Sequence, residues 1–417
     1  MKNVYDIRRE KNLIYILSEK AYADEELLLS EIYSQTAIII YLYYIENLSE
    51  YYNYIENIPH NIDLYIVSSR EEVLEEVRKQ LNLLCRQNVK YLWKENRGRD
   101  VSALLIVGRD IVSRYKYVCF LHDKKEHNEG IKKDTLLWIE NLWGNQIGSP
   151  YYIDSILKLF ENNKDLGILA PPEPVGDNFD AWYGYGWYKS FDITKAIADK
   201  LCLNADLDPN IPPITFGTVL WFRSCAMHKL FDADWKYEDF DDEKLSDENY
   251  LSYGIERIFA YVAQDAGYDT GTSMTVSYAE KQIGYVQYAI GRILREADSF
   301  FPINFSTIEG LNRYLRNREK ITTFTRNHKR VYLYGTGKMS RFCLSVLRKE
   351  NVLPAGCIVS SENGITLLDG IPVILIGELE HSDDIAIIIT VYDAEVQKEI
   401  AEELKRRGFC NYIMFWD

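Results

Sequence analysis

The sequence of 417 residues predicts an α/β protein with a mostly parallel sheet, followed by a second, smaller α/β domain. Two observations predict this class. Short β-like apolar runs alternate with helical segments over residues 37–121, and a similar alternation recurs over residues 331–415. Such alternation is typical of parallel strands whose connecting helices cover both faces of a sheet. An apolar content of 47% is ample for two packed cores.

The order of the apolar runs predicts the elements of the larger domain. Strands are expected over 37–44, 62–68, 89–93, 117–121, 166–170 and 214–222, and helices over 48–55, 71–84, 101–115, 135–143, 155–161 and 250–264. The same pattern predicts four parts of the chain. These are an N-terminal helical segment over 1–34, a large domain over 35–300, a helical connector over 301–329 with a helix over 308–318, and a small domain over 330–417.

The small domain begins with a strand, a glycine-containing loop and a helix. Further strands are expected over 355–359, 385–391 and 412–415, with a hairpin turn at Asp369-Gly370 and a helix over 393–407. Gly335 and Gly337 follow the strand and open the helix, which is the context of a dinucleotide-binding loop. Ser340 replaces the third glycine of that motif, and no Asp ends the next strand. We therefore expect a docking or dimerising module, with a bound nucleotide or sugar phosphate as the alternative.

Charge and cysteine usage exclude several classes of partner. The formal net charge of −15 argues against nucleic acid as a partner. The seven cysteines are scattered, and none forms a CxxC pair, so neither a disulfide framework nor a structural zinc site is expected. The start Met1-Lys2-Asn3 carries a charge where a signal peptide needs apolar residues, and the longest apolar run, 36–45, is too short to span a bilayer. We expect a cytoplasmic protein.

Two polar runs follow predicted strands of the large domain. The first is Asn96-Arg97-Gly98-Arg99-Asp100, and the second is His122-Asp123-Lys124-Lys125. Ligand sites of open α/β sheets lie at the carboxyl ends of strands. Arginine forks and helix N-termini suit phosphate groups, glycine permits close backbone approach, and a carboxylate such as Asp123 can hold a divalent ion. The two runs predict a site for a phosphorylated ligand; charged surface loops are the alternative interpretation.

An acidic stretch precedes the helix expected over 250–264. It contains nine acidic residues and two lysines over residues 232–248, and it ends with Asp247 and Glu248. A carboxylate near an acceptor hydroxyl can take its proton as a general base. Helix capping and solubility are the alternative explanation. Glu256 and Arg257 lie farther along the same helix, where we expect an ion pair.

Five sequence blocks in order resemble the rhamnan synthesis protein F family. They are Glu95-Asn96-Arg97-Gly98-Arg99-Asp100, Phe120-Leu121-His122-Asp123-Lys124-Lys125, Leu169-Ala170-Pro171-Pro172, Phe216-Gly217-Thr218-Val219-Leu220-Trp221-Phe222-Arg223 and Leu251-Ser252-Tyr253-Gly254-Ile255-Glu256-Arg257. The resemblance covers roughly residues 35–275. It implies a GT-A-like, nucleotide-sugar-binding fold and a glycosyltransferase, typically a rhamnosyltransferase, that builds cell-wall or capsular polysaccharide. The small domain resembles Rossmann-like domains appended to polysaccharide enzymes.

The resemblance implies the roles of the site residues. The donor is expected to bind at Asn96 to Asp100, at His122 to Lys125 and at Gly217 and Thr218. Asp247 or Glu248 is expected to be the base, and direct displacement of the nucleoside diphosphate would invert the anomeric centre. A Mg²⁺ or Mn²⁺ ion is implied, with Asp123 as its ligand. The usual acidic motif has two carboxylates, and this sequence supplies one, so Lys124 and Lys125 are the alternative counter-charges.

Two other functions stay open from the sequence. A nucleotide-sugar dehydrogenase or epimerase would use the loop at Gly335 and Gly337, but no Tyr-x-x-x-Lys pair accompanies it, so NAD is not expected. A non-catalytic scaffold of polysaccharide assembly is the other alternative. For a transferase the partners would be the nucleotide sugar, a glycan or lipid-linked glycan acceptor, and a second copy or another polysaccharide enzyme at the small domain. A lipid-linked acceptor would bring the protein to the inner face of the membrane.

Overall fold

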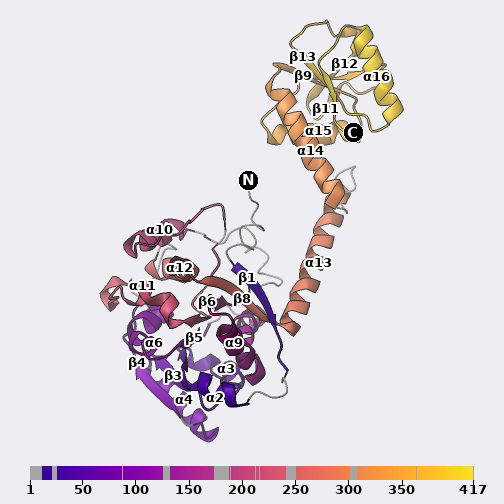
Figure 1. The fold of residues 1–417 in the computed structure, drawn as a ribbon. Coiled ribbons are helices and arrows are strands. Elements are labelled where there is room, and N and C mark those ends of the chain that lie inside the picture. The colour runs from indigo at the N-terminus through magenta and orange to yellow at the C-terminus, as the bar shows by residue number, and fades with distance from the viewer. Residues whose placement is uncertain are drawn as a thin grey trace. The chain divides into compact units, whose positions relative to one another are not determined.

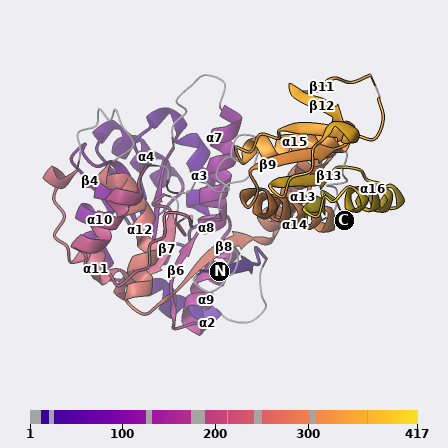
Figure 2. The ribbon, with the colours of Figure 1, turned by 90° about the horizontal axis from the view of Figure 1, so that it is seen from above.

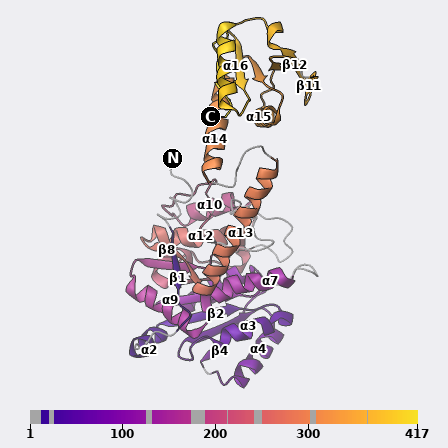
Figure 3. The same cartoon turned by 90° about the vertical axis from the view of Figure 1, so that its right-hand side faces the viewer.

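The computed structural model describes residues 12–20, 26–86, 88–124, 132–172, 187, 189–211, 213–215, 217–240, 250–300, 308–362 and 364–416. The chain divides into two compact units, Met1–Tyr285 and Val286–Asp417. Each unit contains its own sheet (Figure 1). The division falls earlier than residue 300, where we expected it, and it lies within the long helix α13 (Val276–Phe300), which Figure 3 shows as continuous.

The first unit is built on an eight-stranded sheet with the strand order β1-β8-β6-β7-β5-β2-β3-β4. Its strands are β1 (Asn12–Leu17), β2 (Thr36–Tyr41), β3 (Asp63–Ser68), β4 (Val89–Trp93), β5 (Tyr117–His122), β6 (Leu166–Ala170), β7 (Leu220–Arg223) and β8 (Asp269–Thr275). All neighbours pair in parallel except β7, which is antiparallel to both β5 and β6. The predicted α/β class with a mostly parallel sheet is confirmed.

Helices cover both faces of this sheet because side chains alternate along each strand. They are α2 (Glu26–Ser34), α3 (Ser49–Glu56), α4 (Glu71–Leu83), α5 (Arg99–Ser102), α6 (Arg109–Val112), α7 (Lys132–Ile139), α8 (Asn145–Ile147), α9 (Pro150–Asn162), α10 (Phe191–Lys200), α11 (His228–Phe231) and α12 (Leu251–Asp265). Ile38 and Ile40 of β2 pack with α3, α4 and α9, whereas Ala37 and Ile39 pack with α5, α6 and α12. One alternating strand therefore contributes to two separate cores.

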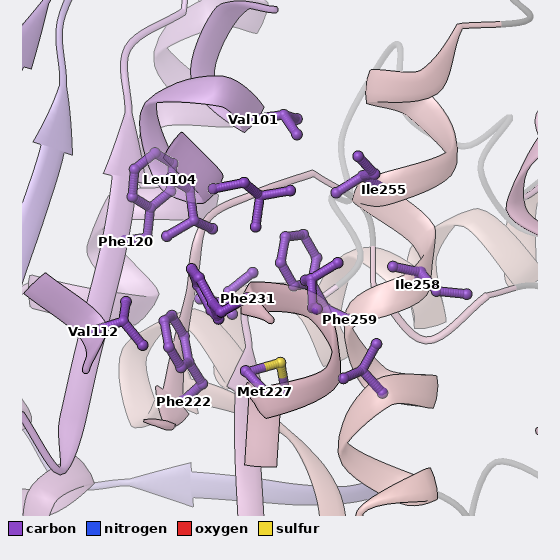
Figure 4. Packing of buried hydrophobic residues seen from close by; sticks show 14 of the residues in the cluster. Val101, Leu104, Val112, Phe120, Phe222, Met227, Phe231, Ile255, Ile258 and Phe259 are labelled. Atoms are coloured by element: carbon purple, nitrogen blue, oxygen red, sulfur yellow. The ribbon is translucent and has the colours of Figure 1, made fainter. Parts of the chain in front are cut away.

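The core beneath α12 joins segments that are far apart in the sequence. Figure 4 shows Phe120 of β5 and Phe222 of β7 in one cluster with Ile255 and Phe259 of α12, and all four side chains are buried. A π-helical stretch, Ala103–Val107, connects α5 to α6 and buries Leu104 in the same core. The sheet and these helices thus place the start of α5 and the first turns of α12 over the same strands.

The second unit contains a six-stranded sheet with the order β11-β12-β10-β9-β13-β14. Its elements are α14 (Ile308–Arg326), β9 (Arg330–Tyr334), α15 (Lys338–Lys349), β10 (Gly356–Val359), β11 (Leu367–Leu368), β12 (Ile371–Leu375), β13 (Ile385–Ile389), α16 (Ala394–Arg406) and β14 (Tyr412–Met414). Only the β11–β12 pair is antiparallel. Helices α15 and α16 pack on opposite faces (Figure 2). Asp369 and Gly370 both have positive φ, as a two-residue hairpin requires.

Three expectations about the elements were wrong. The N-terminal segment 1–34 is not helical throughout, because Asn12–Leu17 is a strand that pairs along its whole length with β8. The two strands are far apart in the sequence, since Asn12 pairs with Thr270, and β8 itself was not predicted. The strand-like run 214–222 is shorter than expected, since β7 begins only at Leu220. The connector 301–329 is not a separate segment, because α14 buries Ile321 in the core of the second unit.

Candidate active site

The sequence-predicted polar runs lie at one edge of the first sheet. Strands β2, β4 and β5 are parallel and end at this edge, and the antiparallel strand β7 begins there. The residues after β4 lead into α5, the residues after β5 include Asp123 and Lys124, and Gly217 and Thr218 precede β7. Carboxyl ends of parallel strands are where ligands bind in open α/β sheets. The topology therefore brings four loops to a single region.

Asp100 is the centre of a buried polar network in this region. The Thr218 hydroxyl donates a hydrogen bond to Asp100 Oδ2, and His122 Nε2 lies 3.7 Å from the same oxygen. Asp100 is 8% exposed, His122 is 6% exposed and Thr218 is fully buried. His122 Nδ1 donates to the carbonyl oxygen of Asp123 at 3.0 Å, so Nε2 carries the lone pair of the neutral ring. The network joins α5, the end of β5 and the loop before β7.

Burial and neighbouring charges set the protonation of this network. Burial would raise the pKa of Asp100, but His122, Lys124 and the Thr218 hydroxyl outweigh it and lower that pKa. Burial lowers the pKa of His122 to about 4, against the opposing attraction of Asp100. At neutral pH the pair therefore consists of a carboxylate and a neutral imidazole. Among the described residues, Nε2 of His122 has no hydrogen-bond partner.

Asp123 is fixed by the main chain that follows β2. Its Oδ2 accepts hydrogen bonds from the backbone N–H groups of Tyr43 at 2.8 Å and Tyr44 at 2.7 Å. Burial raises the pKa of Asp123 to about 6, although the two N–H groups favour the charged form. One carboxylate oxygen is thus committed to holding the β2 and β5 loops together.

Lys124 is held at both of its backbone groups. Its N–H donates to the Tyr51 hydroxyl at 2.8 Å, and its carbonyl accepts from Asn47 Nδ2 at 3.1 Å. The ammonium group lies 4.4 Å from the centre of the Trp138 ring. Burial lowers the pKa of Lys124, and Glu256, Asp100 and Asp123 oppose that effect. The side chain is therefore placed next to acidic groups from three segments.

Glu256 and Arg257 of α12 belong to this site, although the sequence analysis treated them only as an ion pair. Glu256 Oε2 lies 2.8 Å from Arg257 Nη1, and both side chains are largely buried. Burial raises the pKa of Glu256, which interacts electrostatically with Arg257, Asp100 and Lys124. Their place in the last of the five blocks was the signal that could have identified them.

The run from Asn96 to Arg99 contributes mainly to the architecture of the site. Arg97 Nε donates to the carbonyl oxygen of Phe240 at 2.7 Å, and its own carbonyl accepts from Lys94 Nζ at 3.1 Å. Gly98 has φ +72°, and a Cβ there would lie 2.6 Å from Phe240 Cγ. Glycine is thus needed because Phe240 approaches it. Asn96 accepts from the Ser69 hydroxyl at 3.2 Å, and Arg99 is exposed with φ +48°.

Three of the predicted site residues lie outside the described residues: Lys125, Asp247 and Glu248. Gly217 is described and has φ +91°, with open space where a Cβ would be. The residues that the structure brings into direct contact are therefore Asp100, His122 and Thr218, with Asp123 and Lys124 adjoining them.

The described residues do not form a set of ligands for the implied divalent cation. Among them, no group of three His, Cys, Asp or Glu side chains is placed to hold a metal ion. Asp123 commits Oδ2 to two N–H groups, and Lys124 places a positive charge among the neighbouring carboxylates. A divalent ion needs several oxygen ligands and is repelled by an ammonium group. No step of the chemistry below is therefore assigned to a metal.

Two hydroxyl groups, from Ser340 and Thr390, lie beside the glycine loop of the second unit. Gly335 has φ +122°, and a Cβ there would lie 3.1 Å from Thr390 Oγ1. The hydroxyls of Ser340 and Thr390 lie 2.7 Å apart, and Thr390 also donates to the carbonyl oxygen of Tyr334. Gly337 precedes α15 and has open space at its Cβ position. The serine in place of the third glycine thus links the first turn of α15 to the residue that follows β13.

A cavity of about 600 Å³ lies away from the predicted site. It is lined by residues that precede β5 or follow β7, among them Arg109, Lys116, Cys225 and His228. These positions belong to the opposite edge of the first sheet. None of the residues predicted to bind the donor lines this cavity.

Comparison with known proteins identifies the family. The family model described as Rhamnan synthesis protein F matches residues 1–268, which include every part of the network at the sheet edge. The chain belongs to the rhamnan synthesis protein F family. This is the family that the five sequence blocks resemble, so the resemblance is confirmed.

Curated relatives add distant similarity. Two proteins named "Uncharacterized protein WxcX", from two strains of Xanthomonas campestris pv. campestris, are each 23% identical over 254 residues. The match covers 58% of this chain and 33% of each relative, so the chain corresponds to a third of their length. A crystal structure of S. aureus TarS, residues 1–349, is 12% identical and covers 58% of either chain with a TM-score of 0.30. At that score the likeness carries no argument.

The helices described in the structure include none with the length and apolar character needed to cross a membrane.

A pair of glycine substitutions tests the packing of the first polar run. Gly98→Ala is expected to lower the free energy of unfolding by about 2–4 kcal/mol, because strain at positive φ adds to the clash with Phe240. Gly217→Ala is the matched control, since it also has positive φ but meets no atom, and about 1 kcal/mol is expected. Urea unfolding measures both. Equal losses would show that Phe240 does not press on Gly98.

A pH titration of stability tests the environment of Asp123. Its folded pKa, near 6, lies above the ordinary Asp value, so the folded protein binds the proton more tightly. The contribution of Asp123 to unfolding free energy therefore falls as pH rises from about 4 to 6 and is constant above. We expect Asp123→Asn to gain about 2 kcal/mol relative to the wild type over this window, because the neutral amide avoids the cost of a buried charge.

Urea unfolding of the wild type and Asp123→Asn at several pH values measures the difference between their free energies of unfolding. His122, whose pKa is lowered by folding, contributes a pH dependence of opposite sign, but it is present in both proteins and cancels in this difference. A difference that stays constant from pH 4 to pH 7 would contradict the raised pKa.

Proposed function

We propose that the chain is a glycosyltransferase that moves a sugar, rhamnose by the name of its family, from a nucleoside diphosphate donor to a growing cell-surface polysaccharide. The observation that supports this most is the buried network of Asp100, His122 and Thr218 beside Lys124, at the sheet edge where ligands of α/β proteins bind. The whole network lies within the part of the chain that matches the family.

The donor is proposed to bind with its diphosphate beside Lys124. Arg97, Arg99 and Lys125 are the other cations proposed to contact it, together with main-chain groups near Gly98 and Gly217. Arg97 Nε donates to the carbonyl oxygen of Phe240, which supports the position of this guanidinium after β4. Asp123, fixed by two N–H groups, is proposed to orient the sugar rather than to move a proton.

The acceptor hydroxyl is proposed to lose its proton to Asp247 or Glu248. The oxygen then attacks the anomeric carbon, the bond to the diphosphate breaks, and the nucleoside diphosphate leaves with the electron pair. This displacement inverts the anomeric centre. Asp247 and Glu248 come four and three residues before α12, the helix that contributes Glu256 and Arg257 to the site. Their position in the sequence supports the assignment.

The acceptor is proposed to be a glycan or a lipid-linked glycan, and the location the cytoplasmic face of the membrane. The second unit is proposed to bind a second copy of the chain or another enzyme of polysaccharide synthesis. The hydroxyl groups of Ser340 and Thr390, which lie beside the glycine loop, support docking over dinucleotide binding.

Donor screening followed by a transfer assay tests the function. dTDP-, UDP- and GDP-sugars are added to the full chain, and the donor is expected to raise the melting temperature. Release of nucleoside diphosphate should then require a glycan acceptor. Asp123→Asn should lower turnover about a hundredfold while the protein remains folded, because the sugar is no longer oriented for attack.

Asp63→Asn is the matched control, because Asp63 opens β3 at the opposite edge of the sheet and should leave turnover unchanged. A wild-type protein that responds to no nucleotide sugar would contradict the function, and normal turnover of Asp123→Asn would remove this residue from the mechanism.

A further inference from the structure

The family resemblance implies a divalent cation at the end of β5, but the residues there provide a lysine instead. Lys124 follows Asp123 directly, and the described residues contain no set of three metal-ligating side chains. A nucleoside diphosphate carries several negative charges, and a leaving diphosphate needs a cation beside it. The chain must supply that cation if no metal ion is held.

The main chain fixes where the Lys124 side chain begins. Tyr51 of α3 contacts both backbone groups of Lys124, since its hydroxyl accepts from the N–H at 2.8 Å and lies 3.3 Å from the carbonyl oxygen. Asn47 donates a second hydrogen bond to that carbonyl. The preceding residue, Asp123, is bound to the backbone after β2. The main chain of Lys124 is thus fixed at the end of the sheet, so ligand binding costs little entropy for ordering this backbone.

Burial and the neighbouring carboxylates act on the pKa of Lys124 in opposite directions, and burial is the larger effect. Burial lowers the pKa of Lys124, but three carboxylates from different segments, Glu256, Asp100 and Asp123, favour the charged form. The Trp138 ring, 4.4 Å away, adds a cation–π contact. Arg257 opposes the charged form, and Arg257 is itself paired with Glu256. The carboxylates that a metal ion would need already stabilise this ammonium group.

We propose that Lys124 is the resident cation of the site: its ammonium group occupies the field of Asp100, Asp123 and Glu256 in place of a divalent ion and binds the diphosphate of the donor directly. This inference rests on the proposed function and specifies how that site binds its donor without a metal. It also gives the single carboxylate of the run His122 to Lys125 a physical explanation, because a second one at position 124 would bind a metal rather than replace it.

Calorimetric titration with dTDP, UDP and GDP tests the nucleotide part of the proposal. The wild type is expected to bind one of them with the same affinity in EDTA as in Mg²⁺ or Mn²⁺. Lys124→Met should weaken binding about tenfold or more in EDTA, whereas Lys124→Arg should retain most of it because the charge remains. Lys116→Met is the matched control, since Lys116 pairs with Glu161 at the other edge of the sheet. Thermal unfolding confirms that each variant is folded.

Electron paramagnetic resonance of Mn²⁺ without nucleotide tests the cation part independently of any donor. The wild type should leave Mn²⁺ free, and Lys124→Asp should gain a bound ion, because a carboxylate then replaces the ammonium group among the same acids. Nucleotide affinity that rises tenfold with Mn²⁺ would overturn the inference, as would unchanged affinity of Lys124→Met. If the wild type binds none of the three nucleotides, the proposed function fails. Mn²⁺ bound by the wild type but not by Asp123→Asn overturns the resident lysine separately.

Discussion

The hydrogen bond from the Thr218 hydroxyl to the Asp100 carboxylate is the contact on which the arrangement of the site depends. It joins the start of α5 to the loop before β7 across 118 residues of sequence, and His122 adds the end of β5 to the same carboxylate. Because Asp100 is buried, its charge has to be balanced by partners within the protein. Loss of the Thr218 hydroxyl would remove the hydrogen bond that compensates this buried charge, so this contact holds the start of α5 and the loop before β7 together.

Burial shifts the pKa values of three consecutive side chains at the end of β5. Burial lowers the pKa of the His122 and Lys124 side chains and raises that of Asp123. In each case the uncharged form is favoured, and the neighbours decide how much charge survives. Lys124 has three carboxylates in its support, whereas His122 faces one.

Much of the fold could be predicted because alternating apolar runs report local structure. Strands β3, β4, β5 and β6 were expected within a residue of their bounds, and so were α4 and α12. The strand β1 was missed, since its place at the sheet edge depends on pairing with β8 rather than on its own composition. The division within α13 was missed because a continuous helix carries no mark of the point at which contacts change from one unit to the other.

The site was predictable only in part, for a related reason. The residues Asp100, His122, Asp123 and Lys124 were found because they follow strand ends, which are visible in sequence. That Arg97 supports Phe240, and that Gly98 is required by the ring of Phe240, depends on a segment 140 residues away that no local pattern reveals. Glu256 is also a tertiary finding, because its interaction with Lys124 arises from the packing of α12 over the strands.

The most direct test of this account is a crystal structure of the full chain with the nucleoside diphosphate that raises its melting temperature most. The account predicts that the diphosphate lies within hydrogen-bond distance of Lys124 Nζ, at the carboxyl ends of β2 and β5, with the network of Asp100 and Thr218 intact beneath it. A nucleotide bound instead at the loop of Gly335 and Gly337, with that edge of the first sheet empty, would contradict it.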